Sequence, residues 1–139
     1  MNIHEIPFVA LAGIRINPQG LLVQPFDEHT KNHLGTMHAG IQFSLAETAS
    51  GFYLQQRFPE LADHVIPVLR ESKIKYRRPV TGEITANASV SEAVCDQFVH
   101  RLSTRGRSSI EVYVALQDKA GTQVCSGQFI WFVQKDLRS

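Results

Sequence analysis

One long helical pattern, running from His38 to Arg57, constrains the fold of this chain more than any other feature. Apolar residues recur at roughly 100° per residue on one side of it, at Ile41, Leu45, Ala49 and Phe52. A second side carries small residues and one carboxylate, at Gly40, Ser44, Glu47 and Gly51. A backbone or a ligand can approach that second side closely, and Glu47 lies in its middle.

The segments around this helix show strand patterns joined by turns. Apolar, partly alternating residues at 8–16, the turn-forming tetrad 17–20 and residues 21–23 predict a hairpin. Further strands are expected at 72–77, 84–94, 110–116 and 124–133, and a short helix at 96–105. About six strands joined by tight turns favour an antiparallel sheet wrapped around the long central helix, which is an α+β fold. No linker or repeat divides the chain, so residues 1–139 are expected to form a single domain.

Composition excludes several classes of protein. The 14 basic and 13 acidic residues give a net charge of +1, so we expect neither nucleic acid nor an anionic membrane as a partner. No apolar run approaches the ~20 residues of a membrane span, and the N-terminus does not resemble a signal peptide. The two cysteines, Cys95 and Cys125, favour reduced thiols in a cytoplasmic protein over a disulfide framework or a zinc site.

The loop that leads into the long helix is the first place where chemistry is expected. Residues 32–40 contain two glycines and run directly into the helix N-terminus. Free backbone N–H groups and the helix dipole favour negative charge there, so this end can hold an oxyanion. A tight turn with a helix cap explains the same residues equally simply, and the sequence pattern alone leaves both interpretations open.

The residues of this loop and helix resemble a known family. Asn32-x-x-Gly35-Thr36-Met37-His38-Ala39-Gly40, followed after six residues by Glu47-Thr48-Ala49, is similar to the signature N-x-x-G-T-x-H-G-G-x6-D-T-A. That signature belongs to hotdog-fold acyl-CoA thioesterases of the phenylacetate-pathway (PaaI-like) type. Residues 74–83 resemble the I-x-Y-x-x-P-x-x-G strand and turn of that family, and residues 105–121 are similar to its strand–turn–strand end. The resemblance covers roughly residues 20–134.

The resemblance implies a fold, an assembly and a set of catalytic roles. Two hotdog subunits pair edge to edge, as a homodimer or within a homotetramer, and the active sites lie at the interface. Glu47 takes the position of the catalytic carboxylate, which acts as nucleophile or general base on the thioester. Asn32 and the backbone N–H of Ala39 polarise the thioester carbonyl across the interface, while His38 borders the pocket and steadies the loop.

Three positions depart from the pattern of the family. Ala39 replaces the first glycine of H-G-G, which keeps the N–H but adds a Cβ. Glu47 replaces the commoner Asp and reaches one methylene further. Leu69 falls where several relatives have Ser or Thr, and Ser72 is the nearest hydroxyl.

The substrate expected from these residues is a neutral acyl-CoA. Gly40, Phe43, Ser44 and Gly51 leave space beside the helix, with Phe52, Tyr53 and Leu54 expected to close the far end. No cation precedes Arg57 on the helix, so a short- to medium-chain or aromatic acyl group is favoured over a charged one. Hydrolysis to the free acid and CoA would need neither a metal nor an organic cofactor. Arg77 and Arg78 form either a basic rim for the CoA phosphates or the solvated face of a strand.

Other interpretations stay open at this point. A non-catalytic hotdog module that binds acyl-CoA or a similar ligand is the main alternative to a thioesterase. A hotdog dehydratase is less favoured, because no proline-rich segment surrounds His38. His29 and His33 have metal-ligand spacing only on a helix, and no third ligand is near, so no metal site is expected. Both faces of the last strand are apolar, and core packing is the expected role of Phe129 and Trp131.

Overall fold

A computed structural model of the chain describes residues 2–138. Its centre is one six-stranded sheet in which every neighbouring pair of strands is antiparallel. Along the sheet the strands follow the order β1 (Arg15–Ile16), β2 (Leu22–Gln24), β4 (Ile84–Ser89), β5 (Arg107–Gln117), β6 (Gln123–Lys135) and β3 (Val65–Tyr76). The predicted α+β architecture and the antiparallel sheet of about six strands are confirmed.

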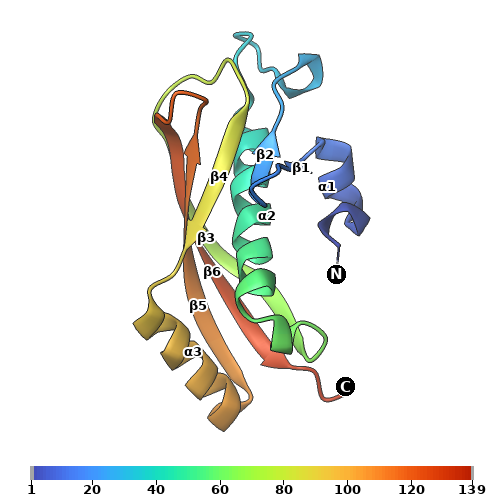
Figure 1. The fold of residues 1–139 in the computed structure, drawn as a ribbon, viewed down its shortest axis with the longest axis vertical. Helices are drawn as coiled ribbons and strands as arrows, with labels where there is room; N and C mark the ends of the chain where they lie inside the picture. Colours follow the sequence, from blue (N-terminus) through green and yellow to red (C-terminus); the bar gives the residue numbers. More distant parts are fainter. Residues whose placement is uncertain (1, 139) are drawn as a thin grey trace.

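The long helix α2 (Ala39–Arg57) lies lengthwise against this sheet (Figure 1). It begins after His38, whose side chain caps it, and it ends at Phe58, immediately before Pro59 and the 3-10 turn η3 (Pro59–Leu61). Its inner side is fully buried at Leu45 and Ala46. The predicted central helix is therefore confirmed, with the predicted ends.

The N-terminal residues differ from the prediction. Residues 8–16 were expected to supply the first strand of a hairpin, but most of them form helix α1 (Pro7–Ala12), which follows the 3-10 turn η1 (Ile3–Glu5). Proline at the first helical position and Gly13 in the left-handed region (φ 80°) define the two ends of α1. The predicted hairpin is confirmed only for residues 15–24, where β1 and β2 pair on either side of the turn at 17–20.

The second difference is where strand β4 ends. It stops at Ser89, and residues 92–94, predicted as strand, belong to helix α3 (Glu92–Arg105). The hydroxyl of Ser91 accepts a hydrogen bond from the N–H of Val94, which caps the helix. Phe98 and Leu102 of α3 pack against the same face of the sheet as α2 does, through Ile110 and Val133.

Strand β3 forms one edge of the sheet, and its twelve residues are exposed or half-buried. Pro67 is tolerated within it because one side of an edge strand needs no N–H donors. A β-bulge interrupts the pairing with β6 between Leu69 and Glu71. The bulged residue, Arg70, places its guanidinium over the ring of Phe132, 3.8 Å from the ring centroid.

Two further observations bear on the compositional predictions. Cys95 and Cys125 are both free and both buried, as expected for reduced thiols. Burial raises the pKa of the Cys125 thiol to about 11, so it stays protonated at neutral pH. None of the helices described between residues 2 and 138 is long and apolar enough to span a bilayer.

Candidate active site

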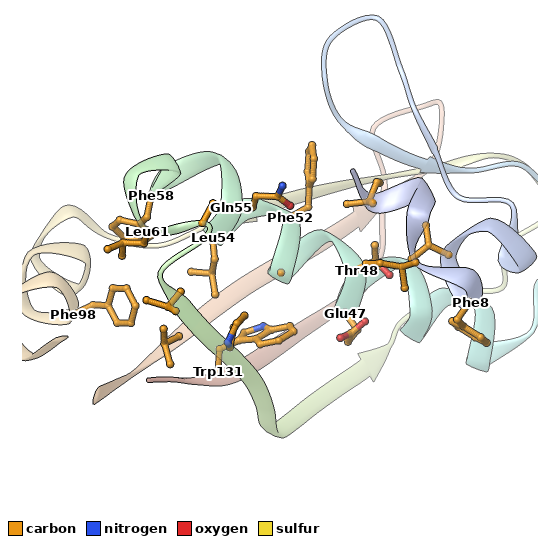
Figure 2. Close-up of a pocket in the computed structure, with 18 residues that line it drawn as sticks. Phe8, Glu47, Thr48, Phe52, Leu54, Gln55, Phe58, Leu61, Phe98 and Trp131 are labelled. Atoms are coloured by element: carbon orange, nitrogen blue, oxygen red, sulfur yellow. The ribbon is translucent and has the colours of Figure 1, made fainter. Parts of the chain in front are cut away.

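A pocket of about 450 Å³ runs beside α2, with Glu47 in its wall (Figure 2). Its walls come from the N-terminal segment, α2, η3, β3, α3 and β6. The lining residues are Ile3, Ile6, Phe8, Val9, Glu47, Thr48, Gly51, Phe52, Leu54, Gln55, Phe58, Leu61, Ala62, Val65, Pro67, Phe98, Trp131 and Val133. Glu47 is the one ionisable side chain among these described residues, so the pocket is an apolar cavity with a single carboxylate.

Glu47 is half-buried on the side of α2 that faces the pocket. Desolvation by the apolar surroundings raises the pKa of its carboxyl above the ordinary value, and a hydrogen bond with the Thr48 side chain opposes the shift in part. A carboxylate with a raised pKa is a stronger base than one in water. It remains ionised near neutral pH when the shift is modest, which suits a general base.

Trp131 forms the wall next to Glu47. Its indole N–H donates to Oγ of Ser50 at 2.8 Å, and the Ser50 hydroxyl donates to the backbone oxygen of Glu47 at 2.6 Å. A Cβ on Gly51 would lie only 3.2 Å from the indole Cζ2, so the glycine is what allows the indole to approach α2 so closely. The hydrogen bonds fix both the indole and this turn of α2.

The loop before α2 is organised by Asn32. Its Oδ1 accepts the N–H groups of Leu34 (2.8 Å) and Thr36 (3.1 Å), and its Nδ2 donates to Oγ1 of Thr36 at 2.8 Å. The second Nδ2 hydrogen faces the Met37 carbonyl at a long 3.5 Å. Most of the amide is therefore engaged in closing the turn, and its role as a donor to a thioester stays a prediction.

His38, Ala39 and Gly40 form the start of α2. Nδ1 of His38 accepts the Gly40 N–H at 2.8 Å, and a Cβ on Gly40 would lie 3.0 Å from that nitrogen, so glycine suits this position. The N–H of Ala39 has no partner within the described chain and lies in an exposed residue. It is free to donate to an oxyanion, as an unpaired N–H in the first turn of a helix can.

Arg77 and Arg78 lie at the same end of α2 as this loop. Tyr76, just before them, donates its hydroxyl to the Ala39 carbonyl at 3.2 Å, which ties the end of β3 to the helix N-terminus. The guanidinium of Arg77 donates to Oγ of Ser126 at 3.1 and 3.3 Å, and Arg77 and Arg78 are both exposed. Both cations are thus placed near the loop and away from the pocket.

The structure therefore divides the predicted site residues into two groups. Glu47 and Gly51 line the pocket, but Gly40, Phe43 and Ser44 do not. Phe43 packs on Phe129 with ring centroids 5.8 Å apart, and the Ser44 hydroxyl donates to the Gly40 carbonyl at 2.7 Å.

Ala39 precedes Glu47 by eight residues, about 12 Å along the helix axis at 1.5 Å per residue. Within one chain, the free N–H and the carboxylate cannot act on the same thioester.

Sequence reasoning missed most of the pocket wall. Trp131 was assigned to core packing, yet it is only half-buried and faces the cavity. Ile3, Ile6, Phe8 and Val9 were not expected in the pocket, because nothing in the pattern shows that the N-terminal segment folds as a helix and returns to α2. Tyr53, expected at the far end, does not line the pocket, and Phe58 and Phe98 lie there instead (Figure 2).

Several solved structures share this fold. A probable thioesterase of unknown function from Pseudomonas aeruginosa is 24% identical, with a TM-score of 0.79 over 95% of this chain and 89% of that one. A Bacillus halodurans protein solved with CoA is 23% identical, with a TM-score of 0.70 over 91% and 74% of the two chains. A thioesterase from Haemophilus influenzae is 19% identical, with a TM-score of 0.73 over 98% and 90%.

These similarities, at such low identity, establish the fold. The chain has the hotdog fold, as the resemblance implied, while its assignment to the phenylacetate-pathway type stays a prediction. No curated protein matches the chain by sequence. Residues 14–133 match the family described as a domain of unknown function, DUF4442, and because this match spans most of the chain, the protein belongs to that family.

Proposed function

We propose that this protein hydrolyses acyl-CoA thioesters, with Glu47 as the catalytic carboxylate. The observation that carries the proposal is one half-buried carboxylate, with a raised pKa, in the wall of an otherwise uncharged 450 Å³ pocket. A buried carboxylate without a cationic partner destabilises the fold, so its presence there favours a functional role. Hotdog-fold neighbours that are called thioesterases, and one solved with CoA, support the same reaction.

The chemistry follows from the basicity of Glu47. Its carboxylate takes a proton from water while the water oxygen bonds to the thioester carbonyl carbon, which gives a tetrahedral oxyanion. The oxyanion collapses, the C–S bond breaks, and the proton returns to the departing CoA sulfur. The products are the free acid and CoA. Direct attack by Glu47, which the resemblance also allows, gives the same products through an anhydride that water then opens.

The oxyanion needs a donor that Glu47 does not have within its own chain. The free N–H of Ala39 is about 12 Å from Glu47 along α2. We therefore propose that a second copy supplies Asn32 and Ala39 at each site, in a homodimer that can pair further into a tetramer. The long edge strand β3 supports this assembly, because Ile66 and Val68 on it are 40% and 49% exposed.

The two arginines near the loop are suited to bind the phosphate groups of the CoA part of the substrate. Arg78 is exposed and Arg77 has one hydroxyl partner, so both guanidinium groups can reach phosphates at the surface. The acyl group would occupy the pocket, which holds no cation to pair with a carboxylate tail among its described lining residues. We therefore expect neutral acyl or aryl groups as substrates and dicarboxylyl-CoAs to be poor ones.

The decisive experiment measures thiol release from a panel of acyl-CoAs by the wild type and by Glu47→Gln. We expect the variant to lose at least ~10²-fold in kcat/KM, because it removes the base and leaves the shape of the side chain nearly unchanged. Glu111→Gln is the matched control, since Glu111 is an exposed carboxylate on β5. Near wild-type activity in Glu47→Gln would refute the assignment, and binding without hydrolysis by the wild type would favour the non-catalytic module.

The assembly has its own test. Light scattering at micromolar concentration should report a dimer or tetramer. Mixing the inactive Glu47→Gln variant with a second inactive variant, altered at Asn32, should restore part of the activity. In a mixed dimer, one of the two sites combines the intact Glu47 of one copy with the intact loop of the other. An active monomer would contradict the proposed interface.

A further inference from the structure

We propose that the pocket is a tunnel for a straight acyl chain of about ten to twelve carbons, with Gly51 and Trp131 as its specificity-determining neck. The chain would start at Glu47, pass the neck and end at the ring pair formed by Phe58 and Phe98. This inference rests on the proposed function, which identifies the ligand as an acyl-CoA thioester, and it adds the length of the acyl chain.

The length of the tunnel comes from the helix that forms its floor. Glu47, Gly51, Leu54 and Phe58 all line the cavity, so it follows one side of α2 for eleven residues. At 1.5 Å per residue this is about 16 Å. A saturated chain advances about 1.25 Å per carbon, because C–C bonds of ~1.5 Å follow a zigzag. About a dozen carbons therefore span the distance, whereas a short acyl or single aryl group would leave the far half empty.

The neck lies between Glu47 and the far end. Figure 2 shows Trp131 between Glu47 on one side and Phe58, Leu61 and Phe98 on the other. The absent Cβ of Gly51 lets the indole pack directly against α2, because a Cβ there would stand 3.2 Å from the ring. A larger side chain at position 51 would push the indole away from α2 and into the passage. The indole is held by its hydrogen bond to Ser50, which is fully buried, so it acts as a fixed wall.

The far end is closed by two buried aromatic side chains. Phe58 and Phe98 are 3% and 2% exposed, and their ring centroids are 5.1 Å apart. They come from the residue that follows α2 and from α3, and they belong to the cluster that joins α3 to the sheet. Because this cluster is packed, a chain that reaches the ring pair has no space beyond it. The maximal chain length is thereby set by α3.

Trp131 allows binding to be measured without turnover. It is the single tryptophan of the chain, so intrinsic fluorescence reports on the neck alone. Saturated acyl-CoAs from butyryl to hexadecanoyl would be titrated into the Glu47→Gln variant, which is not expected to hydrolyse them. We expect Kd to fall up to about fourfold per methylene and to stop falling at ten to twelve carbons. A Kd that is independent of chain length, or that stops falling at four carbons, would overturn the tunnel.

Blocking the neck provides the second measurement. Gly51→Val should weaken dodecanoyl-CoA binding by at least tenfold and leave butyryl-CoA binding within about twofold. Gly82→Val is the matched control, since a Cβ at Gly82 meets nothing within 4 Å and its φ is not positive. If circular dichroism shows that Gly51→Val does not fold, Gly51→Ala replaces it, with a smaller shift in the same direction. Unchanged dodecanoyl-CoA affinity in the folded Gly51 variant would refute the role of the neck.

The two proposals fail in different ways. Length-dependent binding to Glu47→Gln without any hydrolysis by the wild type would refute the thioesterase and support the tunnel. Hydrolysis that is fastest for acetyl- or butyryl-CoA, with no length-dependent change in Trp131 fluorescence, would refute the tunnel and leave the thioesterase in place.

Discussion

Gly127 provides a sharp test of the packing that supports α2. It lies in β6, paired with Ile74 on one side and Val114 on the other. A Cβ built there would lie 2.6 Å from Cε2 and 3.0 Å from Cζ of Phe129, and 3.4 Å from the backbone oxygen of Lys73. Phe129 is fully buried and packs on Phe43 of α2, so its ring cannot move away without disturbing the helix that carries Glu47.

The expected cost of Gly127→Ala follows from this geometry. Forcing a methyl group into a filled core costs about 1–3 kcal/mol, because neighbouring side chains leave their preferred rotamers. Replacing glycine also restricts the unfolded chain, which returns about 0.4–1 kcal/mol. We therefore expect a net loss of about 1–2 kcal/mol in the free energy of unfolding. At Gly82 the same substitution meets open space, so only the gain of about 0.4–1 kcal/mol applies.

Thermal and urea unfolding of the wild type, Gly127→Ala and Gly82→Ala would measure the difference. The two variants should differ by about 2 kcal/mol, which corresponds to about 6–10 °C in Tm for a chain of this size. Gly127→Ala should also lower the Tm relative to the wild type, whereas Gly82→Ala should not. Equal stability of the two variants would show that the ring of Phe129 is not confined and would refute the reasoning.

Three other predictions follow from single contacts. Glu47→Gln should raise the Tm at neutral pH, because burial raises the pKa of Glu47 and the ionised carboxylate therefore destabilises the fold. When Tm is measured over a pH series, the difference between variant and wild type should disappear below pH 4.5, the ordinary pKa of a glutamate carboxyl. In urea titrations, His38→Ala should lower the free energy of unfolding by about 1 kcal/mol, because the helix loses its cap. His38→Asn should retain most of the wild-type stability, because an asparagine side chain can cap the helix as well. Cys95 and Cys125 should react with a chromogenic thiol reagent only in denaturant, since both are buried and the pKa of Cys125 is about 11; rapid native labelling would contradict this.

The strands and the long helix were predictable because their patterns are local. Strand β5 alternates buried and exposed residues from Ser108 to Val114, and α2 combines helical spacing with Pro59 as a stop. The errors fell where local patterns are short. Six apolar residues at 7–12 are compatible with strand or helix, and the burial of Val9 and Ala12 against the core selects the helix. Similarly, the cap at Ser91 outweighs the strand propensity of the residues that follow it.

The candidate site divides in the same way. Glu47 and the loop before α2 could be located from the sequence, because the residues that resemble the thioesterase signature lie within eighteen consecutive positions. The shape of the pocket could not, since Phe8, Phe98 and Trp131 are far apart along the chain and line one cavity only after the chain has folded. The sequence could not show that the Asn32 amide forms hydrogen bonds within the turn, because hydrogen-bond partners depend on the folded loop.

By itself, therefore, the sequence of this protein determined the long helix, the position of Glu47 on it and the antiparallel pairing of the strands packed against that helix. Periodicity and turn chemistry act over a few residues, so they are visible in the order of amino acids. Only the tertiary structure decided how deeply Glu47 is buried, which wall faces it and how far the cavity extends. Those properties arise from contacts between distant segments, and the neck at Gly51 exists only because the indole of Trp131, eighty residues later, packs against it.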